Sequence, residues 1–171
     1  DIWATEPYFR SIAYFSMEIG LDPKIPTYAG GLGILAGDTL KSAADMNIPM
    51  VGVTLLHRKG YFRQEIDKNG LQRELPEVWH PEERLHLLPN EVSVAIEGRV
   101  VRIRAWEYTI VGATGYKVPV YFLDTDYEAN HPDDRKLSWY LYGGDLRYRL
   151  CQELILGVGG LRMLRDLGYN N

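Results

Sequence analysis

The segment with the clearest capacity for chemistry is a glycine-rich loop, Gly30-Gly31-Leu32-Gly33, which leads directly into a helical pattern. Backbone N–H groups in the first turn of a helix have no intrahelical acceptor, and glycines let a ligand approach them closely. The helix dipole adds partial positive charge at the same end. We therefore expect this loop to bind an anion such as phosphate, or a polar sugar. The alternative is a tight turn that serves packing alone.

Charged side chains follow both of the apolar strands that flank this loop. Glu18 follows the first strand, and His57, Arg58 and Lys59 follow the second. The carboxyl ends of parallel strands meet at one edge of a sheet, where ligand-binding groups gather. Glu18 is expected either to order a hydroxyl or a water or to be a surface acid. The three basic residues are expected to be cation-capable groups near the anion site.

A dinucleotide site is a further alternative that the spacing disfavours. Gly31-Leu32-Gly33 together with Ala36 fits the pattern G-x-G-x-x-A. In that motif the glycines follow the first strand directly, whereas residues 18–29 intervene here. The second strand also ends without the acidic residue that would bind a ribose. NAD or FAD binding is therefore not expected.

No metal site is expected either. His80 and His86 lie in a stretch rich in proline and glutamate, and His131 precedes a proline in a loop, so none has metal-ligand spacing. The single cysteine, Cys151, lies in a helical pattern and is expected to be an inert core residue.

The elements that must position these groups begin with a strand, helix and strand. Residues 11–15 and 50–56 are short apolar runs, which predict buried parallel strands joined by a right-handed crossover. The helix between them is expected to end near Asn47, ahead of Pro49. Apolar residues recur within it at helical spacing, at Ile34, Leu35, Leu40, Ala43, Ala44 and Met46.

Residues 60–117 then predict an inserted antiparallel β excursion. Its first hairpin is expected to turn at Asn69-Gly70, and a second pair of strands, 92–96 and 100–105, alternates about Glu97-Gly98-Arg99. Arg102 and Arg104 share one face, which is expected to be solvated.

The remainder of the chain is expected to add one more strand and a long helix. Residues 118–123 predict an apolar strand that ends in Asp124-Thr125-Asp126, before a polar loop. Residues 145–167 predict one long amphipathic helix. Its run Gly157-Val158-Gly159-Gly160 carries a helix-propensity cost of about 1 kcal/mol per glycine, which close packing would offset.

Composition limits the classes of protein that this chain can represent. With 171 residues, 46% of them apolar, the chain can bury the core of one α/β domain. Its net charge of −4 offers no basic field, so nucleic acid and anionic membranes are not expected partners. A lone cysteine suits a reducing cytoplasm. The absence of a starting methionine and the ending at Asn170-Asn171 suggest part of a longer protein.

Two collinear stretches, Ala13 to Gln64 and Leu123 to Leu164, resemble the α-glucan (glycogen and maltodextrin) phosphorylases, in particular their shorter bacterial and archaeal branch. They carry the strings SMEIGL, YAGGLGILAGDTLKSAADM and LYGGDLRYRLCQEL. The resemblance implies a two-lobed B-type glycosyltransferase fold, in which residues 1–171 form part of a Rossmann-like N-terminal lobe. The C-terminal lobe of the same protein would then be a partner, and a homo-oligomer is left open.

The activity that this resemblance implies is reversible phosphorolysis of an α-1,4-glucan by inorganic phosphate, which releases α-D-glucose 1-phosphate. The implied cofactor is pyridoxal 5'-phosphate, held by a lysine outside this segment. By resemblance Glu18 is catalytic, and Gly30, Gly31, Leu32 and Gly33 bind substrate or phosphate, with His57 and Arg58 close to the substrate. The segment alone is expected to be inactive.

Two alternatives remain open from the sequence. A nucleotide-sugar glucosyltransferase of the glycogen or starch synthase type also carries a G-G-L-G loop, although Tyr61-Phe62-Arg63-Gln64 and the later YGGD string favour a phosphorylase. A free-standing glucan-binding domain is the third reading.

Overall fold

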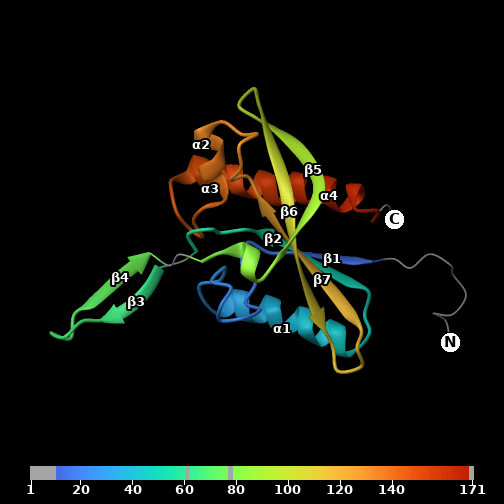
Figure 1. The fold of residues 1–171 in the computed structure, drawn as a ribbon, viewed down its shortest axis with the longest axis horizontal. Coiled ribbons are helices and arrows are strands. Elements are labelled where there is room, and N and C mark those ends of the chain that lie inside the picture. The colour runs from blue at the N-terminus through green and yellow to red at the C-terminus, as the bar shows by residue number, and fades with distance from the viewer. Residues whose placement is uncertain (1–10, 61, 77–78, 170–171) are drawn as a thin grey trace, which may run out of the picture.

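A computed structural model describes residues 11–60, 62–76 and 79–169 of the chain (Figure 1). A five-stranded sheet lies at its centre, with helices on both faces, and one hairpin extends away from the sheet (Figure 1). The expectations that rest on Tyr61 and on the two chain ends lie outside the described residues.

The described part of the chain opens with a strand, a helix and a strand, continues through five further strands and ends in helices. In chain order they are β1 Ile12–Phe15, α1 Gly31–Asp45, β2 Met50–Leu55, β3 Phe62–Ile66, β4 Gln72–Pro76, β5 His86–Ile96, β6 Arg99–Val111, β7 Lys117–Asp124, α2 Pro132–Arg135, α3 Leu146–Leu154 and α4 Gly160–Asp166. Short 3-10 turns occupy Pro81–Glu83 and Lys136–Ser138, and a π-helical turn, Ile155–Gly159, joins α3 to α4.

The main sheet has the strand order β1-β2-β7-β6-β5. β1 pairs with β2 in parallel, and β2 pairs with β7 in parallel, so the predicted strand, helix and parallel strand are confirmed. β6 and β5 extend the same sheet in antiparallel fashion. The sheet is therefore mixed, and the carboxyl ends of its three parallel strands lie at one edge.

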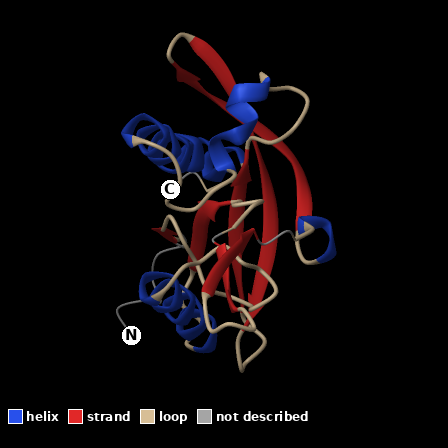
Figure 2. Ribbon diagram, turned by 90° about the vertical axis from the view of Figure 1, so that its left-hand side faces the viewer, coloured by secondary structure: helices blue, strands red, loops and turns tan. Residues whose placement is uncertain are grey.

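Apolar side chains fill both faces of this sheet. One cluster lies between the sheet and the C-terminal helices and contains Val53, Ile103, Cys151, Ile155 and Met163. The other lies between the sheet and α1 and contains Ala36, Leu40, Val120 and Phe122. Figure 2 shows the two helical groups with strands between them. Cys151 is buried in the core, as predicted.

Helix α1 buries a narrower face than its sequence suggests. Its small residues, such as Ala36, and Leu40 are buried, whereas Ile34, Leu35 and Met46 are exposed. The apolar residues that recur at helical spacing in this helix are therefore not all buried. The helix packs closely through its small residues, so large side chains on its flanks remain outside.

The β3–β4 hairpin is confirmed, but the expected two-residue turn at Asn69-Gly70 is wrong. The last paired residues are Ile66 and Gln72, so the connection is longer. The Asp67 side chain accepts hydrogen bonds from the backbone N–H groups of Asn69 and Leu71, and this local interaction selects the wider turn. The short turn lies instead between β5 and β6, where Glu97 and Gly98 both have positive φ.

The predicted helix over residues 145–167 is present, with the unpredicted π-helical turn at its middle. Its glycines permit close packing, as expected. A methyl group on Gly159 would lie 2.5 Å from Ile103 Cδ1, and one on Gly160 would lie 2.7 Å from Phe15 Cε1. π-helical turns occur where a helix accommodates an extra residue, and here the turn coincides with this contact between helix and sheet.

A close approach between backbones also sets the position of α1. A methyl group on Gly37 would overlap the carbonyl oxygen of Gly20, in the segment that follows β1. The Gly20 N–H group donates to the Gly33 carbonyl at 2.8 Å in the same region. Glycine at position 37 therefore allows the first turns of α1 to lie against the end of β1.

We predict that Gly37→Ala lowers the free energy of unfolding by about 1–3 kcal/mol, because the new methyl group must displace backbone. Gly157→Ala is the matched control, since a methyl group there meets no atom within 4 Å. The control should be neutral or stabilising by up to about 1 kcal/mol. Urea unfolding followed by tryptophan fluorescence measures both, and equal effects of the two substitutions would contradict this account.

Candidate functional site

Two of the candidate residues that the sequence indicates, Glu18 and Arg58, lie with Asp124 where the three parallel strands end. Glu18 follows β1, Arg58 follows β2, and Asp124 is the last residue of β7. The N-terminus of α1 lies at the same edge. The loop that precedes this helix donates hydrogen bonds to the Glu18 carboxylate there. This edge is called the rim below.

Glu18 is only 3% exposed, and its carboxylate faces the glycine-rich loop. Its Oε2 atom accepts from the N–H groups of Ala29 at 2.6 Å and Gly30 at 3.4 Å. Its Oε1 atom accepts from the hydroxyl of Tyr142 at 2.7 Å. Glu18 therefore fixes the loop ahead of α1 and joins it to the segment that precedes α3.

The first turn of α1 is open to an incoming ligand. The helix begins at Gly31, and its first intrahelical hydrogen bond runs from Ile34 N–H to the Gly30 carbonyl at 3.2 Å. Among the residues that the structure describes, no side chain caps the helix, and its first turn contains no acidic residue. A methyl group on Gly31 would meet no atom of the described residues within 4 Å, whereas one on Gly33 would overlap Tyr28. Positions 31 and 33 thus differ, the first facing open space and the second packed.

His57 differs from the cation-capable group that the sequence suggests. Its side chain is completely buried, and its Nε2 atom lies 2.9 Å from the carbonyl oxygen of Met17. Burial lowers the pKa of His57 to about 4, against smaller opposing contributions from the Met17 hydrogen bond and the charge of Glu18. The imidazole is therefore neutral at neutral pH, since desolvation disfavours its charged form.

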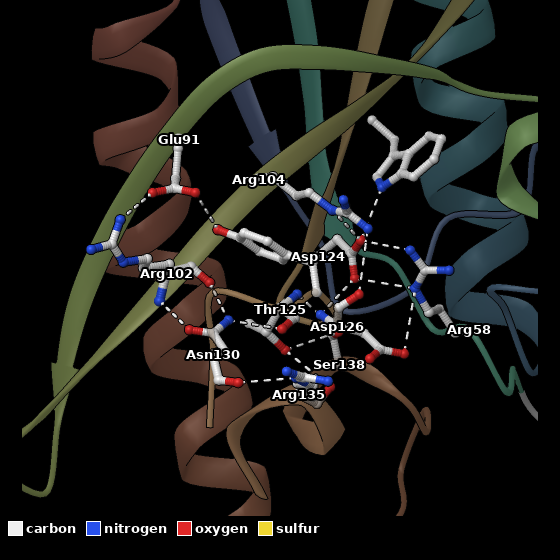
Figure 3. A network of polar contacts seen from close by, with 12 residues as sticks. Arg58, Glu91, Arg102, Arg104, Asp124, Thr125, Asp126, Asn130, Arg135 and Ser138 are labelled. Carbon is white, nitrogen blue, oxygen red and sulfur yellow. Dashed lines mark hydrogen bonds and ion pairs between the residues drawn. The ribbon is translucent and has the colours of Figure 1, made fainter. Parts of the chain in front are cut away.

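Arg58 is held by a buried carboxylate (Figure 3). Asp124 is fully buried and accepts from Arg58 Nη2 at 2.8 Å, Arg104 Nε at 2.9 Å and the Trp106 indole at 3.0 Å. It also accepts from the backbone N–H of Asp126. Burial alone would raise the pKa of Asp124, but hydrogen bonds and charge from Arg58 outweigh burial and lower it. The ionised carboxylate thus joins the end of β7 to the middle of β6 and to the segment that follows β2.

The two arginines on β6 have different surroundings. Arg102 pairs with Glu91, and both side chains are largely exposed, as a solvated face would predict. Arg104 instead pairs with buried Asp124, and its guanidinium lies 4.6 Å from the ring centre of Tyr127. The prediction of a solvated face is wrong for Arg104, because the acidic end of the neighbouring strand draws its guanidinium inward.

Lys59 completes the set of basic residues after β2. Its ammonium lies 4.1 Å from the ring centre of Trp139, in the geometry of a cation–π interaction. Its backbone N–H donates to the carbonyl of the same tryptophan, whose indole donates to Asp126 at 2.8 Å. The segments after β2 and β7 are thereby tied to the segment that precedes α3.

The lysines described by the structure do not fit a Schiff-base role. A lysine that forms a Schiff base needs a desolvated amine, because burial lowers the pKa of the amine and so favours its neutral, nucleophilic form. Lys59 is half-buried, and the other five, Lys24, Lys41, Lys68, Lys117 and Lys136, are exposed.

Within the described ranges no group of three or more His, Cys, Asp or Glu side chains could hold a metal ion. No described helix is long and apolar enough to span a membrane.

Two site residues were missed by sequence reasoning. The signal for Asp124 was present, because an acid at the carboxyl end of a buried strand is well placed for a site, but its arginine partners are distant in sequence. Tyr142 adopts a positive φ of 56°, which is rare for a residue with a bulky side chain, and it reaches Glu18 across 124 residues. No local pattern marks that pairing.

Comparison with known proteins gives a consistent result. The profile of the carbohydrate phosphorylase family matches residues 21–125. The maltodextrin phosphorylase of Thermococcus litoralis is 44% identical over 166 residues, which cover 93% of this chain and 19% of that protein. The glycogen phosphorylase of Mycobacterium tuberculosis is 43% identical, with 90% and 18% covered. That of Aquifex aeolicus is 34% identical, with 96% and 24% covered. The chain thus spans roughly a fifth of the length of these relatives.

We predict that Asp124→Asn lowers the free energy of unfolding by about 3 kcal/mol, because it leaves two largely buried guanidinium groups without their counter-charge. Glu91→Gln is the control, since its ion pair with Arg102 is substantially exposed and should contribute less than about 1 kcal/mol. Urea unfolding of the two variants and the parent measures the difference. A loss for Asp124→Asn no larger than that of the control would show that the buried carboxylate does not hold the rim together.

Proposed function

Because this chain belongs to the carbohydrate phosphorylase family, we propose that it forms part of the N-terminal lobe of a cytoplasmic α-glucan phosphorylase. In this proposal residues 1–171 are one α/β portion of that lobe. The rest of the polypeptide completes a two-lobed B-type glycosyltransferase fold, with the active site between the lobes. The mixed sheet with helices on both faces is compatible with that role.

The proposed reaction is reversible phosphorolysis of an α-1,4-glucan. The bond between C1 of the terminal glucose and O4 of the next unit breaks, a phosphate oxygen bonds to C1, and O4 takes up a proton. The products are α-D-glucose 1-phosphate and a glucan shorter by one unit. Charge develops at C1 and on phosphate, so the site must supply fixed dipoles in a position that water does not reach.

The observation that carries this proposal is the open N-terminus of α1. The N–H groups of Gly31, Leu32 and Gly33 precede the first intrahelical hydrogen bond, so they can donate to a phosphate or sugar oxygen. Glu18 holds the preceding loop through two N–H groups and so orients those that follow. Preorganised donors of this kind stabilise charge without rearranging during the reaction.

Pyridoxal 5'-phosphate, the cofactor that this family implies, would be held by a lysine in the rest of the polypeptide. Arg58 is proposed to lie close to the substrate at the rim, with its charge balanced by Asp124. The contribution of this chain is therefore binding and orientation through backbone N–H groups.

Two other functions make different experimental predictions. A nucleotide-sugar glucosyltransferase would transfer glucose from UDP- or ADP-glucose and would not depend on phosphate. A free-standing glucan-binding domain would have the mass of this chain alone, 19.6 kDa, and no turnover. Family membership favours the phosphorylase over both.

The decisive experiment incubates the full-length protein with maltodextrin and inorganic phosphate and measures glucose 1-phosphate. The expected result is product formation that requires phosphate, together with the absorbance of bound pyridoxal phosphate. Transfer from UDP- or ADP-glucose without a need for phosphate would overturn the proposal. So would a native mass equal to that of this chain with binding but no turnover.

We predict that Gly31→Leu in the full-length enzyme lowers kcat/KM for phosphorolysis by roughly 100-fold, because the side chain occupies the space in front of the helix N–H groups. The fold should be retained, since a methyl group at this position meets nothing within 4 Å. Gly31→Ala should give a smaller loss, and the thermal midpoints of both variants should match the parent. Near-normal phosphorolysis by Gly31→Leu would remove this loop from the site.

A further inference from the structure

His57 stands out as a buried polar group that the proposed chemistry does not use directly. Its side chain is 0% exposed, so it cannot touch a glucan or phosphate at the rim. Its backbone is fixed as well, because its carbonyl accepts from the Trp79 indole at 3.1 Å and from Gly60 N–H at 2.9 Å. The imidazole therefore projects from a firmly anchored position at the end of β2.

The hydrogen bond from His57 defines the tautomer of the ring. Met17 presents a carbonyl oxygen, which can only accept, so the Nε2 atom carries the proton. The Nδ1 atom is then a buried lone pair, and within the part of the chain that the structure describes it has no hydrogen-bond partner. A buried acceptor without a donor is unfavourable, and an apolar side chain of similar size would avoid this cost.

This cost is offset because His57 orients the peptide group between Met17 and Glu18. The Met17 carbonyl shares one rigid plane with the N–H of Glu18, so a hydrogen bond to that carbonyl fixes the direction in which Glu18 leaves the strand. Ser16 completes the turn by donating from its hydroxyl to the Glu18 carbonyl at 2.7 Å. The Glu18 carboxylate in turn holds the N–H groups of Ala29 and Gly30.

We propose that His57 is a positioning residue that acts through the Met17–Glu18 peptide to hold the glycine-rich loop in its ligand-binding geometry. This inference rests on the proposed function of that loop. It gives His57 an indirect role in place of the direct contact with substrate that the resemblance implied. The chain of contacts runs from the end of β2, across to the end of β1, and then to the N-terminus of α1. For this role the side chain needs a hydrogen-bond donor at the position of Nε2, and it does not need a positive charge.

The test compares two substitutions in the full-length protein. His57→Gln keeps an amide N–H that can reach the Met17 carbonyl, whereas His57→Leu fills space without a donor. We expect His57→Leu to lower kcat by about tenfold or more per folded molecule, since small misplacements of a site are costly. His57→Gln should stay within about threefold of the parent. Thr54→Val is the control, because Thr54 is also buried and its hydroxyl has no partner among the described residues, so its replacement should not alter kcat.

A second measurement does not depend on activity. Hydrogen exchange of the peptide that spans residues 27–33 should accelerate in His57→Leu and remain at the parental rate in His57→Gln. Exchange within residues 37–45 of α1 should be equal in all variants. Parental exchange and kcat in His57→Leu would overturn the inference, as would equal losses in the Leu and Gln variants. If the parent lacks phosphorolysis, the proposed function fails, while the exchange data still decide whether His57 holds the loop.

Discussion

The arrangement of the rim depends on one buried carboxylate, that of Asp124. Placing an anion where it is fully buried is unfavourable unless donors and opposite charges surround it. Here Arg58 and Arg104 supply charge, and Trp106 supplies an indole N–H, so the donors come from the segment after β2 and from β6. Removing any one of these donors would leave the others around an under-compensated charge. The end of β7, the middle of β6 and the segment after β2 are therefore held in one arrangement rather than a range of them.

Close backbone packing fixes the positions of the helices, as the Asp124 carboxylate fixes those of the strands. Gly37 lets α1 approach the segment after β1, and Gly159 and Gly160 let the C-terminal helix approach the sheet. Larger residues at these places would move the helices outward and, for α1, would carry its N-terminus away from Glu18. The position of the glycine-rich loop thus follows from two kinds of contact, steric at Gly37 and electrostatic at Glu18.

Local patterns predicted the elements well and the long-range pairings poorly. Strand and helix periodicity identified β1, α1, β2 and the C-terminal helix, because each pattern reflects burial of one segment against a sheet. The wider turn at Asp67 and the inward course of Arg104 depend on side-chain hydrogen bonds that compete with the average preference. The neutral state of His57 depends on complete burial, which no spacing reveals. The link from Tyr142 to Glu18 joins residues 124 positions apart.

The charges at the rim bear on how the proposed site would bind phosphate. In the proposed reaction phosphate would bring negative charge close to Glu18, and helix N–H groups provide only partial positive charge. Among the described residues that follow β2, His57 is neutral, Arg58 is balanced by Asp124, and Lys59 lies over an aromatic ring. None of these three is therefore an uncommitted cation for the phosphate. Balance would have to come from groups on the opposite side of the ligand, which suits a site formed between two lobes.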